Sequence, residues 1–193
     1  MDPPDLFIFD GATGAGKSTL LELLRNEYSK RILVGTKLTT RKRRNDDNDW
    51  EFRFVAQVPD AHLKYSFHSV GHEYALDIDA LGRARSAGLV YAISCVDRQI
   101  VQRLRSDFST VAVYVYRPWK ENDFEALLAT RGISEPKDVH LRMTEIATVS
   151  REYLEKVDLY DHVILNIGSE ADVRAQLVRV MEFHGIERDE GRD

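Results

Sequence analysis

The sequence has almost no cysteine, no long apolar run and no excess of positive charge, and each absence excludes a class of protein. The single cysteine, Cys95, excludes an internal disulfide framework and fits a reducing compartment. No stretch approaches the roughly 18 apolar residues that span a membrane. The formal net charge of -5 favours neither nucleic acid nor an anionic membrane as a partner. The segment MDPPDLFIFD is too acidic, and its apolar run too short, for a signal peptide, so we expect a cytoplasmic protein.

What is present suits one globular domain with small insertions: 193 residues, 43% hydrophobic and 31% charged. Apolar runs rich in β-branched and aromatic residues alternate with helical patterns. This alternation predicts an α/β fold with a doubly wound parallel sheet. The expected strands are 6–9, 31–34, 89–94, 110–116 and 161–166, and the expected helices are 18–28, 97–105, 121–130, 138–156 and 170–183.

Two segments interrupt the alternation. Residues 37–87 form a long excursion between core strands, and 130–138 carries a glycine and a proline between two helices. Insertions of this kind in a compact domain often act as binding loops or lids. We therefore predict a core of about 5–36 and 88–185, and a charged tail over 186–193 that frays.

The segment GATGAGKS, residues 11–18, fits the P-loop pattern G-x-x-x-x-G-K-[ST] and lies between a strand and a helix, as the pattern requires. Its glycines let backbone N–H groups surround a polyphosphate at the positive end of a helix. Lys17 can reach the β- and γ-phosphates, and the Ser18 hydroxyl can ligate Mg²⁺. The pattern predicts a P-loop NTPase core that binds ATP and Mg²⁺ through Gly11, Ala12, Thr13, Gly14, Ala15, Gly16, Lys17, Ser18 and Thr19.

A basic cluster, KLTTRKRR (residues 37–44), follows the second expected strand. It fits a solvated loop balanced by the acidic residues that follow it, or a nuclear localisation patch. Its position at the start of the insertion favours a third interpretation, a site for an anionic substrate, because guanidinium groups can bind phosphate oxygens as a fork. Contact with RNA is a weak alternative, because the chain is acidic and aromatic residues are not interleaved.

Six segments together resemble the guanylate kinases: GATGAGKSTL, LTTRKRR, EFRFV, VGHEYAL, ATRGISEPKDVHLRM and YDHVILN occur in that family's order and at similar spacings. The resemblance covers about residues 6–185. It implies a P-loop core that carries an acceptor-binding subdomain (about 37–87) and a lid (about 130–138). It also implies an activity for the protein, the transfer of a phosphoryl group from ATP to a phosphorylated small molecule.

The resemblance also implies roles for individual residues. Arg41 and Arg44 correspond to ligands of the acceptor phosphate, and Tyr74 corresponds to a tyrosine that helps to hold it. Arg131 and Arg142 correspond to lid-side arginines that bridge the donor and acceptor phosphates. Without the resemblance, these last two would read as surface residues. Guanidinium groups at such positions can neutralise the charge on the transferring phosphoryl group.

The sequence departs from the guanylate kinases where that family reads guanine. A tyrosine of the acceptor site is Phe52 here, the guanine-reading carboxylate falls at about Tyr65, and a serine falls at Leu76. A lid arginine falls at Leu127. A site that reads guanine needs hydrogen-bonding partners for it. We therefore expect an acceptor other than GMP.

The acidic residue of the cleft is left open by the sequence. The family's acidic positions fall at about Ser94 and Val96, whereas LDID lies earlier, at residues 76–79. Asp77 or Asp79 can cap a helix or line the acceptor cleft. Asp97, just after a strand, is a further candidate.

The segment YSFHSVGHEYAL, residues 65–76, is similar to the acceptor loop of ribose 1,5-bisphosphate phosphokinases, which also lack the guanine-reading carboxylate. That similarity makes His68 a candidate acceptor contact, beside its alternative as a partly exposed structural residue. With Arg41, Arg44, Phe52, Tyr65, Tyr74 and Asp77, it completes the predicted substrate-binding set.

The sequence thus predicts a kinase that uses ATP and Mg²⁺ and acts on a nucleoside monophosphate other than GMP or on a sugar phosphate. The main alternative is a catalytically silent guanylate kinase-like binding module, which would be expected to have a degraded P-loop. A regulatory GTPase would be expected to show an N-K-x-D segment, which the sequence lacks. We expect no nucleic acid and no membrane as partner, and a homodimer is one of the oligomeric states left open.

Overall fold

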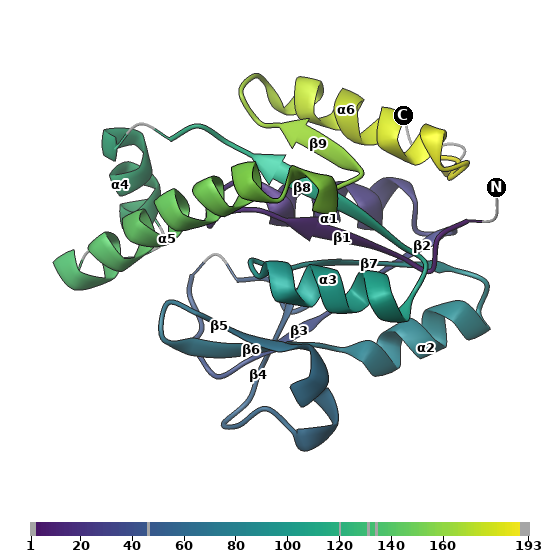
Figure 1. Cartoon of the computed structure of the whole chain (residues 1–193), viewed down its shortest axis with the longest axis horizontal. Helices are drawn as coiled ribbons and strands as arrows, with labels where there is room; N and C mark the ends of the chain where they lie inside the picture. Colours follow the sequence, from purple (N-terminus) through teal and green to yellow (C-terminus); the bar gives the residue numbers. More distant parts are fainter. Residues whose placement is uncertain (1–2, 46, 120, 131, 134, 190–193) are drawn as a thin grey trace.

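The computed structural model describes residues 3–45, 47–119, 121–130, 132–133 and 135–189 (Figure 1). Its centre is a five-stranded parallel sheet with the strand order β2-β7-β1-β8-β9. The strands are β1 (Leu6–Asp10), β2 (Ile32–Val34), β7 (Val90–Ser94), β8 (Thr110–Tyr116) and β9 (His162–Leu165). The order reverses at β1, so the loop after β1 opens at the switch point where ligands of such sheets bind.

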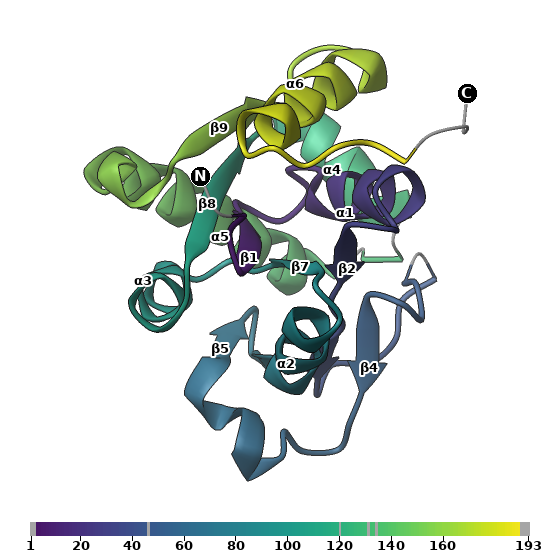
Figure 2. The same ribbon diagram turned by 90° about the vertical axis from the view of Figure 1, so that its right-hand side faces the viewer.

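Helices cover both faces of this sheet (Figure 2). Phe7 and Phe9 of β1 pack in one cluster with α1 (Lys17–Glu27) and α6 (Glu170–Phe183). Leu6 and Ile8 pack in the other with α2 (Ile78–Ser86) and α3 (Arg98–Asp107). Alternate residues of a strand point to opposite faces, so a strand covered on both sides is apolar throughout. The predicted doubly wound α/β core is confirmed.

A second, four-stranded sheet occupies the excursion between β2 and β7, with the strand order β4-β3-β6-β5. It consists of β3 (Lys37–Thr39), β4 (Phe52–Phe54), β5 (Ser66–Ser69) and β6 (His72–Leu76), with the 3-10 helix η1 (Asp60–Tyr65) before β5. Figure 1 shows it below the main sheet. Its chain leaves β3 directly into the arginine-rich segment, so those side chains start from a fixed strand end.

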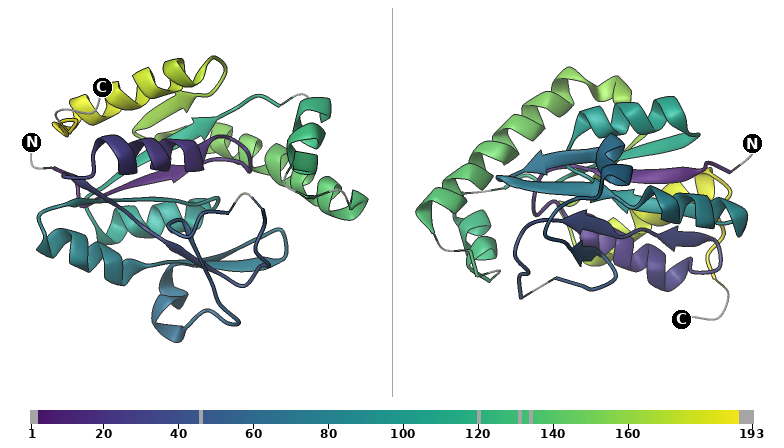
Figure 3. Two further views of the ribbon diagram at one scale, coloured as in Figure 1. Left: turned by 180° about the vertical axis from the view of Figure 1, so that it is seen from behind. Right: turned by 90° about the horizontal axis from the view of Figure 1, so that it is seen from below.

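Two helices extend beyond the main sheet, α4 (Glu121–Thr130) and α5 (Pro136–Glu155), and project together from the body (Figure 3). Pro136 suits the first turn of α5, because that position needs no N–H donor. Near its other end, the α5 residue Tyr153 stacks on Tyr114 of β8 with ring centroids 3.9 Å apart. After the 3-10 helix η2 (Val157–Leu159) the chain enters β9. No helix in the described ranges has both the length and the apolar character to cross a membrane.

Side-chain caps fix the starts of three of the described helices, α2, α3 and α6. The Asp97 carboxylate accepts hydrogen bonds from the N–H groups of Gln99 and Ile100 at the start of α3. Ser169 and Asp172 form a reciprocal capping box at the start of α6. Such caps satisfy N–H groups that have no partner within the helix.

One edge of the main sheet is occupied by a side chain. At β9 the Gln176 amide both accepts from the Leu165 N–H, at 2.8 Å, and donates to the Leu165 carbonyl, at 2.9 Å. Gln176 belongs to α6, so the helix that covers the sheet also closes its last strand.

Beneath the end of α6, two histidines share one hydrogen bond. The Nε2 atoms of His162 and His184 lie 2.8 Å apart, and the His184 ring meets Phe7 edge-on. Burial lowers the pKa of both imidazoles, and for His184 the neighbouring His162 lowers it further. The pair keeps this bond only while at least one of its Nε2 atoms carries no proton.

We predict that acid weakens the fold through this pair. A histidine whose pKa is lower folded than unfolded stabilises the protein fully above about pH 6.5, and that stability falls as the pH drops toward the folded pKa. The urea midpoint of the parent should therefore be lower at pH 5.5 than at pH 7.5. In a His162→Gln/His184→Gln double variant the difference should shrink. An equal shift in both proteins would show that other groups carry the acid sensitivity.

Candidate functional site

The loop after β1 has the backbone that a P-loop requires. Gly11 has φ 146°, and a Cβ there would lie 2.3 Å from the carbonyl oxygen of Val115. Gly16 has φ 105°, and its Cβ would lie 2.5 Å from the side-chain nitrogen of Asn166. That Asn166 amide donates to the Ala15 carbonyl at 2.9 Å, which fixes the loop to the end of β9. The positive φ favours glycine at both positions, and at Gly11 the backbone of Val115 also leaves no space for a side chain.

Lys17 lies inside this loop. Its ammonium donates to the carbonyl oxygens of Gly11, at 2.6 Å, and Ala12, at 2.9 Å. Burial, followed by the nearby positive charge of Lys37, lowers the pKa of Lys17 to about 8. A phosphate group entering the loop would replace these neutral carbonyl partners with anionic oxygens and strengthen the ammonium's hydrogen bonds.

A cavity of about 420 Å³ opens beside the loop and extends to the second sheet. Its residues come from the P-loop and α1, from the second sheet with its arginine segment, from α4 and α5, and from the segments that follow strands of the main sheet. They include Thr13, Gly14, Gly16, Lys17, Ser18, Thr19, Lys37, Arg41, Arg44, Glu51, Phe52, Phe67, Ser69, Tyr74, Leu127 and Arg142. Gly11, Ala12 and Ala15, the other predicted P-loop residues, do not line the cavity, and Ala12 and Ala15 are buried. The cavity thus joins a polyphosphate loop to a cluster of cations.

Arg41 is held rigidly at the far side of the cavity. Its two terminal nitrogens donate to the two carboxylate oxygens of Asp47 at 2.6 and 2.5 Å, and both side chains are at most 5% exposed. The guanidinium lies 4.6 Å from the ring centroid of Phe52 and 5.3 Å from that of Phe54. Phe52 therefore supports an arginine through its ring face, where a tyrosine would also offer a hydroxyl.

The charge of Arg44 is opposed by neighbouring positive charges. Burial and the positive charges of Arg142 and Arg41 lower the pKa of Arg44 to about 10. It still carries its charge at neutral pH. Arg142 reaches the same space from α5 and is itself buried. Three guanidinium groups facing one cavity repel each other and are stabilised by an anion placed between them.

A buried network lies between the loop and this cluster. Oε1 of Glu51 accepts from the Ser18 hydroxyl and from the Lys37 ammonium, each at 3.0 Å. Lys37 also donates to the Ser94 hydroxyl at 2.7 Å. A hydroxyl and a carboxylate in contact are oxygen donors of the kind that Mg²⁺ prefers, so Ser18 and Glu51 fit a magnesium ion. Glu51 and Lys37 were not predicted as site residues, although both belong to segments with a sequence signal, EFRFV and KLTTRKRR.

The three acidic candidates lie outside this cavity. Asp77 caps α2 by accepting from the N–H of Ala80, as one of the two sequence interpretations predicts. Asp79 is exposed on α2, and Asp97 caps α3. Asp77 and Asp79 lie near His62, with one ligand atom of each residue within 4.8 Å of the others, but Asp77 is already engaged by Ala80 and by Arg83.

Two predicted acceptor contacts also point elsewhere. Tyr65, the last residue of η1, is 5% exposed, and its hydroxyl donates to the carboxylate of Asp107 at the end of α3, at 2.6 Å. His68 is exposed on β5, whereas its neighbours Phe67 and Ser69 line the cavity. The alternation of a strand explains this: residues that flank an outward side chain point inward. Arg131 lies outside the described residues, and the other predicted contacts, Phe52 and Tyr74, line the cavity.

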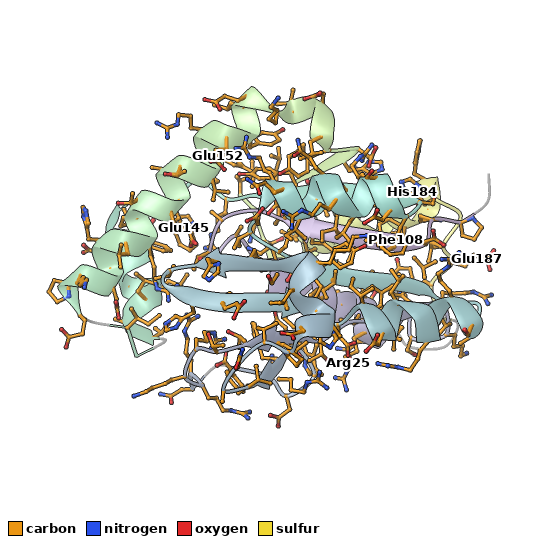
Figure 4. All side chains as sticks on the ribbon, turned by 60° about the horizontal axis from the view of Figure 1, so that its bottom comes forward. Arg25, Phe108, Glu145, Glu152, His184 and Glu187 are labelled. Carbon is orange, nitrogen blue, oxygen red and sulfur yellow. The ribbon has the colours of Figure 1, made fainter. Side chains whose placement is uncertain are left out.

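A second carboxylate connects the parts of the site. Glu145, on the side of α5 that faces the second sheet (Figure 4), accepts from the hydroxyls of Thr13 in the P-loop and Ser69 on β5. Leu127 of α4 lies against Gly14 and lines the cavity. The projecting helices are therefore in contact with both halves of the site. The sequence carried no local signal for Glu145, because its partners are remote in the chain.

The chain is similar to guanylate kinases in both sequence and structure. The chain is 28% identical over 171 residues to the guanylate kinase of Chlamydia pneumoniae, covering 84% of this chain and 80% of that one. It is 23% identical over 168 residues to the guanylate kinase of Mycoplasmoides gallisepticum, covering 83% and 84%. The crystal structure of guanylate kinase from Anaplasma phagocytophilum matches 93% of this chain and 84% of its own, with a TM-score of 0.61 and 14% identity.

A more distant likeness concerns the fold alone. The SH3-kinase fragment of tight junction protein 3 matches 96% of this chain and 60% of its own, with a TM-score of 0.52 and 9% identity. No protein-family model matches the chain.

We predict that Asp47→Ala destabilises the protein by about 3–5 kcal/mol, because it leaves the Arg41 guanidinium buried without its carboxylate. Asp49→Ala is the matched control: Asp49 pairs with Arg43 at the surface, where its side chain is 84% exposed. That variant should change the free energy of unfolding by less than about 1 kcal/mol. Urea unfolding of the two variants checks the comparison, and equal losses would contradict a buried structural role for Asp47.

Proposed function

Because the chain is guanylate kinase-like in sequence and fold, we propose that it is an ATP- and Mg²⁺-dependent kinase that phosphorylates an already phosphorylated small molecule. The observation that carries this proposal is the single cavity that joins Lys17 and Ser18 to Arg41, Arg44 and Arg142. Each group of residues suits an anion, and phosphoryl transfer must bring two anionic molecules together.

The roles follow from the geometry. Lys17 and the loop N–H groups bind the donor phosphates, and Ser18 with Glu51 would hold Mg²⁺, which neutralises phosphate charge when bound. Arg44 and Arg41 bind the acceptor phosphate, with Tyr74 beside them. Arg142, and Arg131 by the family resemblance, stabilise the charge on the transferring group. The acceptor's own phosphate oxygen is the nucleophile, so no strong base is required.

We further propose that the acceptor is not GMP, but another nucleoside monophosphate or a sugar phosphate such as ribose 1,5-bisphosphate. Tyr65 and Leu76 are buried in the core and offer nothing to a guanine edge. On the acceptor side, the carboxylates of Asp47 and Glu51 are bound to Arg41 and Lys37. Phe67 and Tyr74 instead line the cavity as a stacked pair of rings, and an aromatic surface suits the face of a sugar or a base.

The second candidate is a catalytically silent guanylate kinase-like binding module, the alternative that the sequence leaves open. The Lys17 position and the glycine conformations described above favour a loop that holds a polyphosphate. A module that only binds a protein has no need of either.

We predict that Lys17→Ala reduces phosphoryl transfer at least about 100-fold, because it removes a cation aimed at the donor phosphates. Lys64→Ala is the control, since Lys64 is 63% exposed and pairs with Asp107 on the surface. ATP consumption and product mass are measured together. Retained transfer in the Lys17 variant would contradict the proposed donor site.

We predict one dominant acceptor in a panel of nucleoside monophosphates, deoxynucleotides and ribose 1,5-bisphosphate, read by product mass, with GMP turned over at least about tenfold less efficiently. If GMP is the best substrate, the assignment from Tyr65 and Leu76 is wrong. ATP binding without transfer to any acceptor would instead favour the binding module.

A further inference from the structure

Glu51 is an unusual carboxylate, because it is almost fully buried and yet touches the P-loop serine. Its side chain is 3% exposed, and its Oε1 receives both the Ser18 hydroxyl and the Lys37 ammonium. A buried carboxylate is stable only with a cation and hydrogen bonds around it. Here the serine that suits Mg²⁺ and a lysine bind the same oxygen atom.

The ends of the neighbouring core strands offer no alternative. β7 ends in Ser94 and continues as Cys95 and Val96, none of which carries a carboxylate. Asp10 at the end of β1 is buried and held by the Gly11 N–H and the Tyr160 hydroxyl. A carboxylate near Ser18 therefore has to come from another part of the chain.

Among the described residues, three carboxylates line the cavity: Glu22, Asp47 and Glu51. Asp47 is bound by both terminal nitrogens of Arg41. Glu22 is exposed on α1, one turn beyond Ser18. Of these three carboxylates, Glu51 is the one that accepts a hydrogen bond from the Ser18 hydroxyl.

We propose that Glu51 is the protein carboxylate of the divalent-cation site, and that Lys37 is a positioning residue that holds this carboxylate beside Ser18 until the cation binds. The assignment rests on the proposed ATP- and Mg²⁺-dependent function. An ammonium and a divalent cation both bind a carboxylate by its negative charge, so they compete for Oε1. Once Glu51 turns to the cation, the Lys37 charge is available to the phosphate groups in the same cavity.

Glu51 and Lys37 both belong to the part of the chain that forms the second sheet, which also carries the acceptor arginines. Glu51 directly precedes Phe52 of β4, and Lys37 begins β3, whose end leads to Arg41. The lysine ammonium also lies 4.6 Å from the ring centroid of Phe52. Cation binding on the donor side is thereby linked to the sheet that carries the acceptor arginines, and the two ligands should bind with positive coupling.

The test uses Mn²⁺ and ATP without any acceptor, so that it requires binding but no turnover. Free Mn²⁺ is followed by electron paramagnetic resonance during titration of the protein–ATP complex. Glu51→Gln should weaken Mn²⁺ binding at least about tenfold. Lys37→Met removes the competing ammonium and should leave Mn²⁺ binding as tight as in the parent or tighter. Opposite behaviour of two partners in one ion pair is not expected of a purely structural pair.

Glu22→Gln is the matched control, because it makes the same change of charge in the same cavity and should leave Mn²⁺ affinity unchanged. A Glu51→Gln/Lys37→Met double variant, which buries no unpaired charge, should fold and still show the weakened binding. Parent-like Mn²⁺ affinity in Glu51→Gln would overturn the inference. So would equal losses in Glu51→Gln and Lys37→Met, or a loss confined to Glu22→Gln.

These results separate the inference from the function. If the parent is active but its Mn²⁺ affinity does not depend on Glu51, the assignment of Glu51 is wrong and the proposed kinase function stands. If Mn²⁺ affinity depends on Glu51 but no acceptor is phosphorylated, the cation site stands and the proposed kinase function is contradicted. A parent that binds no Mn²⁺ with ATP would overturn both.

Discussion

The contact of Glu51 with Lys37 and Ser18 joins the two sheets of the molecule where the cavity lies between them. Its members come from the second sheet, from the start of α1 and, through Ser94, from the end of β7. Both charged side chains are at most 8% exposed, so neither can satisfy its charge with water. The two charges compensate each other within the second sheet, and their further hydrogen bonds, to Ser18 and Ser94, form only when that sheet is seated on the core. The shape of the cavity is therefore tied to the pairing of one ammonium with one carboxylate.

The remaining cations of the cavity differ in how far the protein itself compensates them. Arg41 has a full carboxylate partner and two ring faces, and its position is fixed with or without a ligand. Lys17 donates to two backbone carbonyls, and the charge of Arg44 is opposed by two other guanidinium groups. These two sites are stabilised most by an incoming anion. Arg41 is therefore a fixed part of the cavity wall, whereas Lys17 and Arg44 gain the most free energy from binding an anion.

The features that could be predicted from the sequence are those whose signal is local. The strand and helix patterns, the P-loop and the arginine segment each depend on residues within a few positions of one another. The roles of Glu51 and Glu145 could not be predicted because their partners are distant in the sequence. Glu51 binds Ser18, 33 residues away, and Glu145 binds Thr13, 132 residues away. Whether His68 points into the cavity or away from it depends on the face of β5 that it occupies. That face is set by the register between β5 and β6. Tyr65 precedes that strand, where only tertiary packing decides its direction.

The Gln176 side chain at β9 has a consequence for how this protein meets other chains. An uncovered edge strand offers its backbone groups to any extended peptide, and such edges seed strand addition and aggregation. At Leu165 both groups are already taken by an amide that mimics the backbone of a neighbouring strand. An incoming strand would have to displace this amide before it could pair there. The helix residue thus acts as a built-in stop to the growth of the sheet.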